Sequence, residues 1–127
     1  MKQSKDQTTA AKPKEDGASA VVIEKVFDFV KWIMSKVENF PRSYKFTLGN
    51  RIVENSLDLL SSLVEAAYSH EKVTDLVRAG RKANLLRYLF RLSKEKNIIS
   101  FKSYQFSAAQ LFEIGRMIGG WLRYCEK

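Results

Sequence analysis

The sequence predicts an all-α fold, an antiparallel four-helix bundle. Beyond residue 20, four long segments repeat apolar residues at intervals of three and four, which is the spacing of one helix face. No segment alternates apolar and polar residues, and no Asn-Gly or Asp-Gly pair indicates a hairpin. The connections between the four segments are short. Short connections favour antiparallel neighbours, so we expect up-down-up-down topology.

Residues 1–20 are expected to form a disordered tail before the bundle. They contain no Leu, Ile, Val or aromatic residue. Such a segment cannot bury enough apolar surface to offset the entropy lost on ordering. The length of the remaining chain suits one domain with a single core, so we expect the four-helix bundle over residues 21–127.

The first helix is expected over residues 21–39. Its apolar face consists of Ile23, Val26, Val30, Ile33, Val37 and Phe40. Pro41 excludes the residue before it from the helical conformation, so the helix should end at Phe40.

The second and third helices are expected over residues 43–69 and 72–96. The inward residues predicted for the second helix are Ile52, Val53, Leu57, Leu60, Val64 and Ala67. Those predicted for the third helix are Leu76, Ala79, Ala83, Leu86 and Phe90. Residues 97–99 then turn the chain.

The fourth helix is expected to begin after Ser100, whose hydroxyl can cap it. Its apolar residues form two seams at heptad spacing. The first seam suits the core and consists of Tyr104, Ala108, Leu111, Gly115, Ile118, Leu122 and Cys125. The second is expected at or near contacts with another subunit and consists of Ile114, Met117, Trp121 and Tyr124. The alternative is that a small bundle buries this helix on both sides.

Positive charge is concentrated in the third helix. The whole chain has a net charge of +8, and residues 72–96 contain eight cations against two anions. The residues expected to bind nucleic acid or a protein partner are Arg78, Arg81, Lys82, Arg87, Arg91 and Lys94. A nearly single-signed helix with polar and aromatic neighbours is typical of a phosphate-binding surface. The alternative is a solvated face that only maintains solubility.

Several classes of function are not supported by the sequence. It contains one Cys and one His, too few for a structural zinc site, and it lacks a glycine-rich phosphate loop. We therefore expect no catalytic residue, no metal and no cofactor. No apolar run approaches the ~20 residues of a membrane span, and no signal peptide is visible. These absences predict a cytoplasmic protein that does not enter membranes.

Three segments resemble a known family. They are Phe40-Pro41-Arg42 with Leu48-Gly49, residues 86–92 (Leu-Arg-Tyr-Leu-Phe-Arg-Leu), and residues 113–122, which include Gly115, Arg116, Gly119 and Trp121. Together they are similar to the accessory variability determinant (Avd) family of diversity-generating retroelements, over about residues 21–125. Four-helix bundle proteins encoded in intervening sequences of large-subunit ribosomal RNA genes are related to that family.

The resemblance implies a barrel-like homopentamer with a non-enzymatic role. Its partners would be the reverse transcriptase and the template RNA, or an RNA/DNA hybrid, bound without clear sequence specificity to support mutagenic reverse transcription. One residue, Arg87 or Arg91, could instead be held partly by packing or by a carboxylate such as Glu54 or Asp58, and would then matter for folding. The alternative function is a structural or protein-interaction bundle of the ribosomal intervening-sequence type, whose basic face meets an acidic protein partner.

Overall fold

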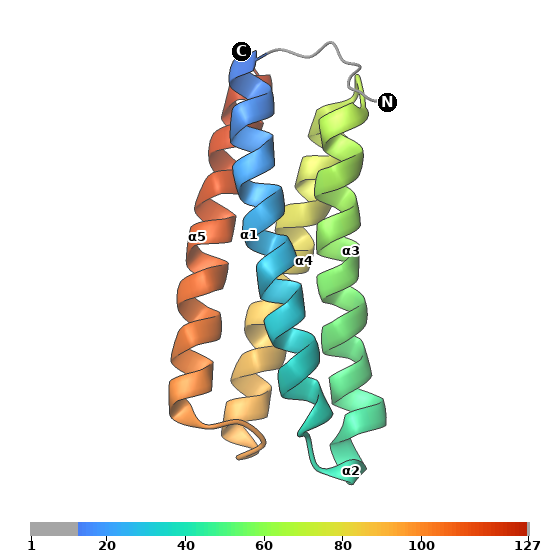
Figure 1. Cartoon of the computed structure of the whole chain (residues 1–127), viewed down its shortest axis with the longest axis vertical. Coiled ribbons are helices and arrows are strands. Elements are labelled where there is room, and N and C mark those ends of the chain that lie inside the picture. The colour runs from blue at the N-terminus through green and yellow to red at the C-terminus, as the bar shows by residue number, and fades with distance from the viewer. Residues whose placement is uncertain (1–12, 127) are drawn as a thin grey trace.

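The computed structural model describes residues 13–126, and every regular element in that range is helical (Figure 1). The short elements at one end are α2 (Arg42–Tyr44) and the π-helix η1 (Lys45–Gly49). The four long helices are α1 (Pro13–Glu38), α3 (Asn50–Tyr68), α4 (Lys72–Glu95) and α5 (Phe101–Cys125).

The four long helices form one bundle. Each packs on the next in chain order, and α5 also packs on α1. Figure 1 shows the chain descending along α1, rising along α3, descending along α4 and rising along α5. As a result, α1 lies across the bundle from α4, and α3 lies across from α5.

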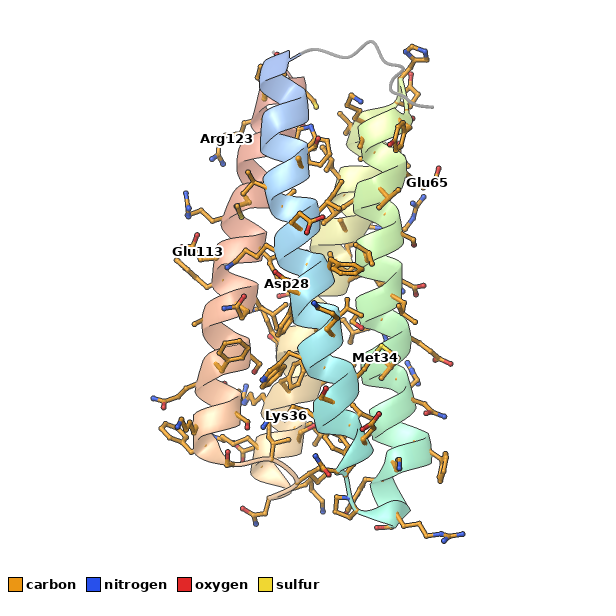
Figure 2. The ribbon with its side chains drawn as sticks, in the orientation of Figure 1. Asp28, Met34, Lys36, Glu65, Glu113 and Arg123 are labelled. Carbon is orange, nitrogen blue, oxygen red and sulfur yellow. The ribbon has the colours of Figure 1, made fainter. Side chains whose placement is uncertain are left out.

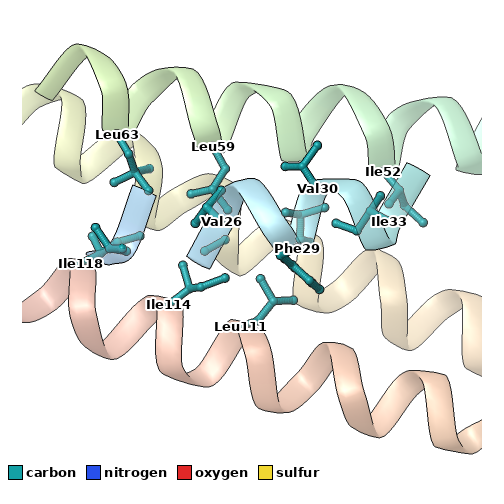
Figure 3. Packing of buried hydrophobic residues seen from close by; sticks show 14 of the residues in the cluster. Val26, Phe29, Val30, Ile33, Ile52, Leu59, Leu63, Leu111, Ile114 and Ile118 are labelled. Atoms are coloured by element: carbon teal, nitrogen blue, oxygen red, sulfur yellow. The ribbon is translucent and has the colours of Figure 1, made fainter. Parts of the chain in front are cut away.

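The core runs along the bundle axis and receives side chains from every long helix. Figure 3 shows Val26, Phe29 and Ile33 of α1 meeting residues of α3 and α5 there. Aromatic rings connect three of the helices. The Phe29 ring lies 6.1 Å from that of Phe90 on α4, and the Trp32 ring lies 4.7 Å from that of Phe106 on α5. These ring contacts fix how α1, α4 and α5 are rotated relative to one another.

Helix α1 begins earlier than the sequence analysis predicted. It starts at Pro13 rather than at Val21, and Ser19 within the expected tail is buried. Proline is compatible with a first helical position because that residue has no intrahelical N–H bond to lose. A segment without large apolar residues can thus extend a helix whose later turns are packed. The rest of the expected tail, residues 1–12, lies outside the described residues.

Helix α3 turns a different face inward from the one predicted. Leu57 and Val64 were expected in the core, yet their side chains are 44% and 37% exposed. Ile52 is buried as predicted, and Val53, Leu60 and Ala67 are partly buried against the core. The other buried residues of α3 are Asn55, Ser56, Leu59, Ser62, Leu63 and Ala66. Three of these are polar, which concealed the true inner face in the sequence. Two of them have hydrogen bonds that make burial possible: the Ser56 hydroxyl donates to the Val53 carbonyl at 2.8 Å, and the Asn55 amide donates to the Arg51 carbonyl at 2.7 Å.

Helix α5 buries residues from both predicted seams. Leu111 and Ile118 of the first seam lie in the core together with Ile114 and Trp121 of the second. A helix between two neighbours buries a wide stripe, so the alternative of a helix covered on both sides holds for Ile114 and Trp121.

The turn between α4 and α5 follows the predicted chemistry. Asn97 adopts a left-handed backbone conformation with φ of 60°, which asparagine tolerates better than most residues. Ser100 then caps α5, because its hydroxyl accepts a hydrogen bond from the Ser103 backbone N–H at 3.0 Å. The predicted cap is confirmed.

The start of α3 approaches the end of α1 closely at Gly49. A Cβ atom at this position would lie 2.8 Å from the Val37 side chain and 3.4 Å from that of Phe40. Gly49 is buried in the π-helix η1, whose wider turn holds one more residue than an α-helical turn. A side chain at residue 49 is therefore excluded by packing rather than by backbone conformation.

We predict that Gly49→Ala lowers the free energy of unfolding by about 1–3 kcal/mol, because the new methyl group overpacks the contact with Val37. Gly80→Ala is the matched control, since nothing lies within 4 Å of its added Cβ. That substitution should stabilise by about 0.5–1 kcal/mol through backbone entropy. Urea titration followed by circular dichroism measures both. Equal stabilisation by the two substitutions would contradict the close approach.

Candidate nucleic-acid interface

Helix α4 presents its basic residues to solvent because its apolar stripe is narrow. All five residues that the sequence assigned to its inner face are buried, together with Ser93. The remaining positions form a broad outer surface, and the cations on it fall into two groups according to whether a carboxylate holds them.

Arg78 and Lys82 lie on the side of α4 that faces α3, and each forms an ion pair with a carboxylate. Arg78 pairs with Asp75 one turn earlier, with 2.8 Å between nitrogen and oxygen. Lys82 reaches across to α3, where its ammonium lies 3.2 Å from an Asp58 oxygen and donates to the Asn55 side-chain oxygen at 3.1 Å. Asn55 is itself buried and donates to the Arg51 carbonyl. Lys82 therefore helps to satisfy a buried polar side chain between two helices.

Lys94 lies at the other side of α4, next to α5. Its ammonium lies 5.0 Å from the centre of the Tyr104 ring and 3.7 Å from a Glu95 oxygen. The favourable position over the ring face makes Lys94 part of the packing between α4 and α5.

Arg81, Arg87 and Arg91 form the second group. All three are exposed, and within residues 13–126 none makes an ion pair, a side-chain hydrogen bond or a ring contact. The expectation that Glu54 or Asp58 could hold Arg87 or Arg91 is wrong, because Asp58 pairs with Lys82 on the opposite side of α4. We refer to these three residues as the free arginines.

The free arginines have polar and aromatic neighbours on α4. Asn84 is exposed one turn before Tyr88, whose side chain is 61% exposed. At about 100° per residue, Arg87, Arg91 and Asn84 face the α5 side of α4, whereas Arg81 and Tyr88 point away from the bundle. The arrangement gives a strip of fixed positive charge with no carboxylate bound to it, to which a phosphate chain can bind.

The predicted subunit-contact residues of α5 occupy different environments. Trp121 is only 4% exposed and Ile114 is fully buried, so both belong to the core of the single chain. Met117 is half-buried and Tyr124 is exposed. Ile114 and Trp121 thus supply no exposed apolar surface, because α5 is covered on this side by its neighbours.

An exposed apolar strip occurs instead along the boundary between α1 and α3. Phe27 and Met34 are seven residues apart on α1, and Leu57 and Val64 are seven residues apart on α3. Trp32 on the other side of α1 faces α5, and Asp58 on the other side of α3 faces α4. The four exposed residues therefore lie on the sides of α1 and α3 that face away from α5 and α4; Figure 2 shows Met34 near the boundary between α1 and α3. We call them the α1–α3 strip.

On α5, Arg116 of the Gly-Arg segment forms an ion pair with Glu113 one turn earlier. It donates to the Glu113 carboxylate at 2.7 Å, and this hydrogen bond lowers the pKa of Glu113 and raises the pKa of Arg116. Figure 2 shows Glu113 at the outer side of α5. Arg116 is thus exposed but locally neutralised.

The described part of the chain holds no group of three His, Cys, Asp or Glu residues arranged to bind a metal ion. None of its helices is long and apolar enough to cross a membrane. The surface features that remain are charge on α4 and exposed apolar side chains, which include the α1–α3 strip and Phe101, Phe112 and Tyr124 of α5. Both kinds of feature suit binding.

Comparison with known proteins identifies a family model and a similar solved structure. A family model described as bAvd-like matches residues 20–125. A similar solved structure is that of a protein of unknown function from the S23 ribosomal protein family of Bacteroides thetaiotaomicron. The TM-score is 0.78 at 18% identity, and the match covers 84% of this chain and 98% of that one. At this identity the likeness concerns the fold alone. No curated protein matches the chain.

We predict that Lys82→Met lowers the free energy of unfolding by about 1–2 kcal/mol, because the buried Asn55 oxygen loses its donor and Asp58 loses its partner. Methionine retains most of the side-chain packing. Arg81→Met, which removes an unpaired cation from the same helix, should change stability by no more than about 0.5 kcal/mol. Thermal and urea unfolding of both variants measure the difference. Equal stabilities would show that the hydrogen bond and ion pair of Lys82 contribute nothing.

Proposed function

The chain belongs to the bAvd-like family, the accessory proteins of diversity-generating retroelements, and from this membership we propose that it binds a reverse transcriptase and its template RNA. The role is non-enzymatic: the protein supports mutagenic reverse transcription by bringing the polymerase and the template together. No cofactor is involved.

The observation that carries the proposal is the unpaired state of the free arginines. A surface cation without a carboxylate neighbour can bind phosphate without first breaking an ion pair. Residues 72–96 hold eight of the chain's 22 cations but two of its 14 anions, so the field around α4 attracts polyanions. Binding through backbone phosphates discriminates little between sequences, in agreement with a template-handling role.

We also propose that the protein assembles as a barrel-like homopentamer. Contiguous apolar side chains on a monomer surface are typical of an interaction site, and the α1–α3 strip has that character. Subunits of a ring are related by rotation, so each contact joins two different faces. The α1–α3 strip would supply one of those faces. Met117 and Tyr124 stay in the proposal as contact residues, whereas Ile114 and Trp121 would support the interface from the core.

A second candidate function is an interaction bundle with an acidic protein partner. The observation in its favour is that no carboxylate within residues 13–126 pairs with the free arginines. The same free arginines would then bind carboxylates. The genomic neighbourhood distinguishes the two: a reverse transcriptase gene with paired template and variable repeats favours the retroelement role, and a ribosomal RNA locus favours the alternative.

We predict that Arg87→Ala combined with Arg91→Ala weakens binding to RNA and reduces the slope of log affinity against log salt. For a single strand, the reduction should be roughly 0.7 for each phosphate that is no longer neutralised. Arg78→Ala combined with Lys82→Met is the matched control on the same helix. It should change the slope less, because both cations are already paired with carboxylates. Fluorescence anisotropy over a salt series measures both slopes.

Circular dichroism of each variant shows whether the helices are retained. If both folded variants keep the affinity and the salt slope of the unsubstituted chain, α4 is not the nucleic-acid surface. If the unsubstituted chain binds an acidic protein but no RNA, the second candidate function is the correct one.

We predict that Leu57→Glu disrupts the assembly, because burying a charge in an apolar contact is costly. Light scattering should give a multiple of the 14.6 kDa chain mass for the unsubstituted protein and a lower mass for the variant. Leu92→Glu is the control: Leu92 on α4 is 48% exposed, close to the 44% of Leu57, but lies away from the strip. A monomeric unsubstituted protein at all working concentrations would refute the assembly.

A further inference from the structure

We propose that α4 binds unpaired nucleotides, with the ring of Tyr88 stacked on a base and the guanidinium groups of Arg81 and Arg91 on flanking phosphates. This inference rests on the proposed function and specifies its ligand: single-stranded segments of nucleic acid rather than duplex.

The geometry places the aromatic ring between two cations. Arg81, Asn84, Tyr88 and Arg91 follow one another at intervals of three, four and three, so they form one row along α4, in which Arg81 and Tyr88 point outward and Asn84 and Arg91 are turned toward the α5 side. All four are exposed. At 1.5 Å per residue, Arg81 and Arg91 are separated by roughly 15 Å along the helix axis. We call this row the α4 ridge.

The core does not account for the position of Tyr88. Tyr44 and Tyr104 are partly buried and pack against the core, whereas the side chain of Tyr88 is 61% exposed. Within residues 13–126, Tyr88 makes no ring contact and its hydroxyl makes no hydrogen bond. Its neighbours on the α4 ridge are two of the free arginines and an amide. The ring is thus an exposed aromatic surface with groups that bind phosphate and bases on one side and the half-exposed Leu92 on the other.

An unpaired base with its flanking phosphates is the ligand that can contact both the exposed Tyr88 ring and the neighbouring arginines. Every base offers a flat face on which an aromatic ring can stack, and stacking on aromatic side chains combined with a cationic track is how proteins bind single strands without sequence preference. In a duplex the base faces are covered by their neighbours, and exposing one requires unstacking. A convex helical ridge can reach duplex phosphates with its arginines, but its tyrosine would then have no base face to contact.

A protein partner would use the same residue types differently. Tyrosine and arginine are also enriched at the energetic centres of protein interfaces. Such centres are well packed and shielded from water by surrounding apolar contacts, whereas Arg81, Asn84 and Arg91 around Tyr88 are all polar and exposed. The charge of α4 favours a polyanion, so binding of a protein partner through Tyr88 would be a contrary outcome.

The test compares Tyr88→Ala and Tyr88→Phe with the unsubstituted protein. Each is titrated with a single-stranded RNA and with a hairpin duplex of equal length, at several salt concentrations. Tyr68→Ala is the matched control, because Tyr68 on α3 is 88% exposed and far from the α4 ridge along the bundle axis. Circular dichroism confirms that every variant retains its helices.

We expect Tyr88→Ala to lower the affinity for the single strand by roughly five- to a hundredfold, the range for loss of one stacked base. The salt slope should not change, because every cation that binds phosphate is retained. Affinity for the duplex should stay the same. Tyr88→Phe should retain most of the single-strand affinity, since stacking does not require the hydroxyl, and Tyr68→Ala should bind like the unsubstituted chain.

Three results would overturn the inference. The first is that Tyr88→Ala binds the single strand as the unsubstituted chain does, and the second is that it loses single-strand and duplex affinity equally. The third is that it keeps RNA binding while losing a protein partner. In each case the chain still binds RNA, so the proposed function stands. Absence of RNA binding by the unsubstituted chain would instead refute the proposed function, and this inference with it.

Discussion

The rotation of α4 about its own axis determines which side chains the protein offers to a partner. Phe90 fixes that rotation because its ring packs against Phe29 and Trp32 of α1, on the far side of the bundle. With Phe90, Leu86 and Ala83 directed inward, the positions between them must point to solvent. The free arginines are therefore held outward by the packing of apolar neighbours on the same helix, and a change of one residue in that register would turn the cations toward the core, where their burial is prohibitive.

How much the sequence predicted depended on how clearly each helix separates apolar from polar residues. On α4 a single apolar stripe stands among charges, and its inner face was predicted correctly. On α3 the inner face includes Asn55, Ser56 and Ser62, whose burial the spacing of apolar residues did not indicate, and the prediction selected the exposed Leu57 and Val64 instead. On α5 apolar residues surround much of the helix, so spacing did not show that Ile114 and Trp121 would both be buried. The contacts of Lys82 with α3 could not be foreseen, because its hydrogen-bond acceptor Asn55 lies 27 residues away and its ion-pair partner Asp58 is on the same helix as Asn55.

The division of the α4 cations follows from where the neighbouring helices place carboxylates and rings. Lys82 faces α3, which contributes Asp58, and Lys94 faces Tyr104 of α5. Arg78 pairs with Asp75 of α4 itself. The free arginines lie where neither neighbour supplies a partner. A net charge alone could not distinguish these groups. The six basic residues nominated from the sequence thus have separate roles: some join helices within the bundle, and the others remain available for a ligand.

The α1–α3 strip and the free arginines Arg87 and Arg91 lie on opposite faces of the bundle, since α1 packs across from α4 and these arginines face α5. Self-association that joins the strip to a face away from α4 would leave the cationic faces of all subunits uncovered. Several such faces on one body would bind a single polyanion with high avidity, because after the first contact the remaining sites meet the same strand at a high effective concentration. Weak individual contacts would then suffice for long residence on a long template, and each contact could still release quickly enough for the strand to move across the surface.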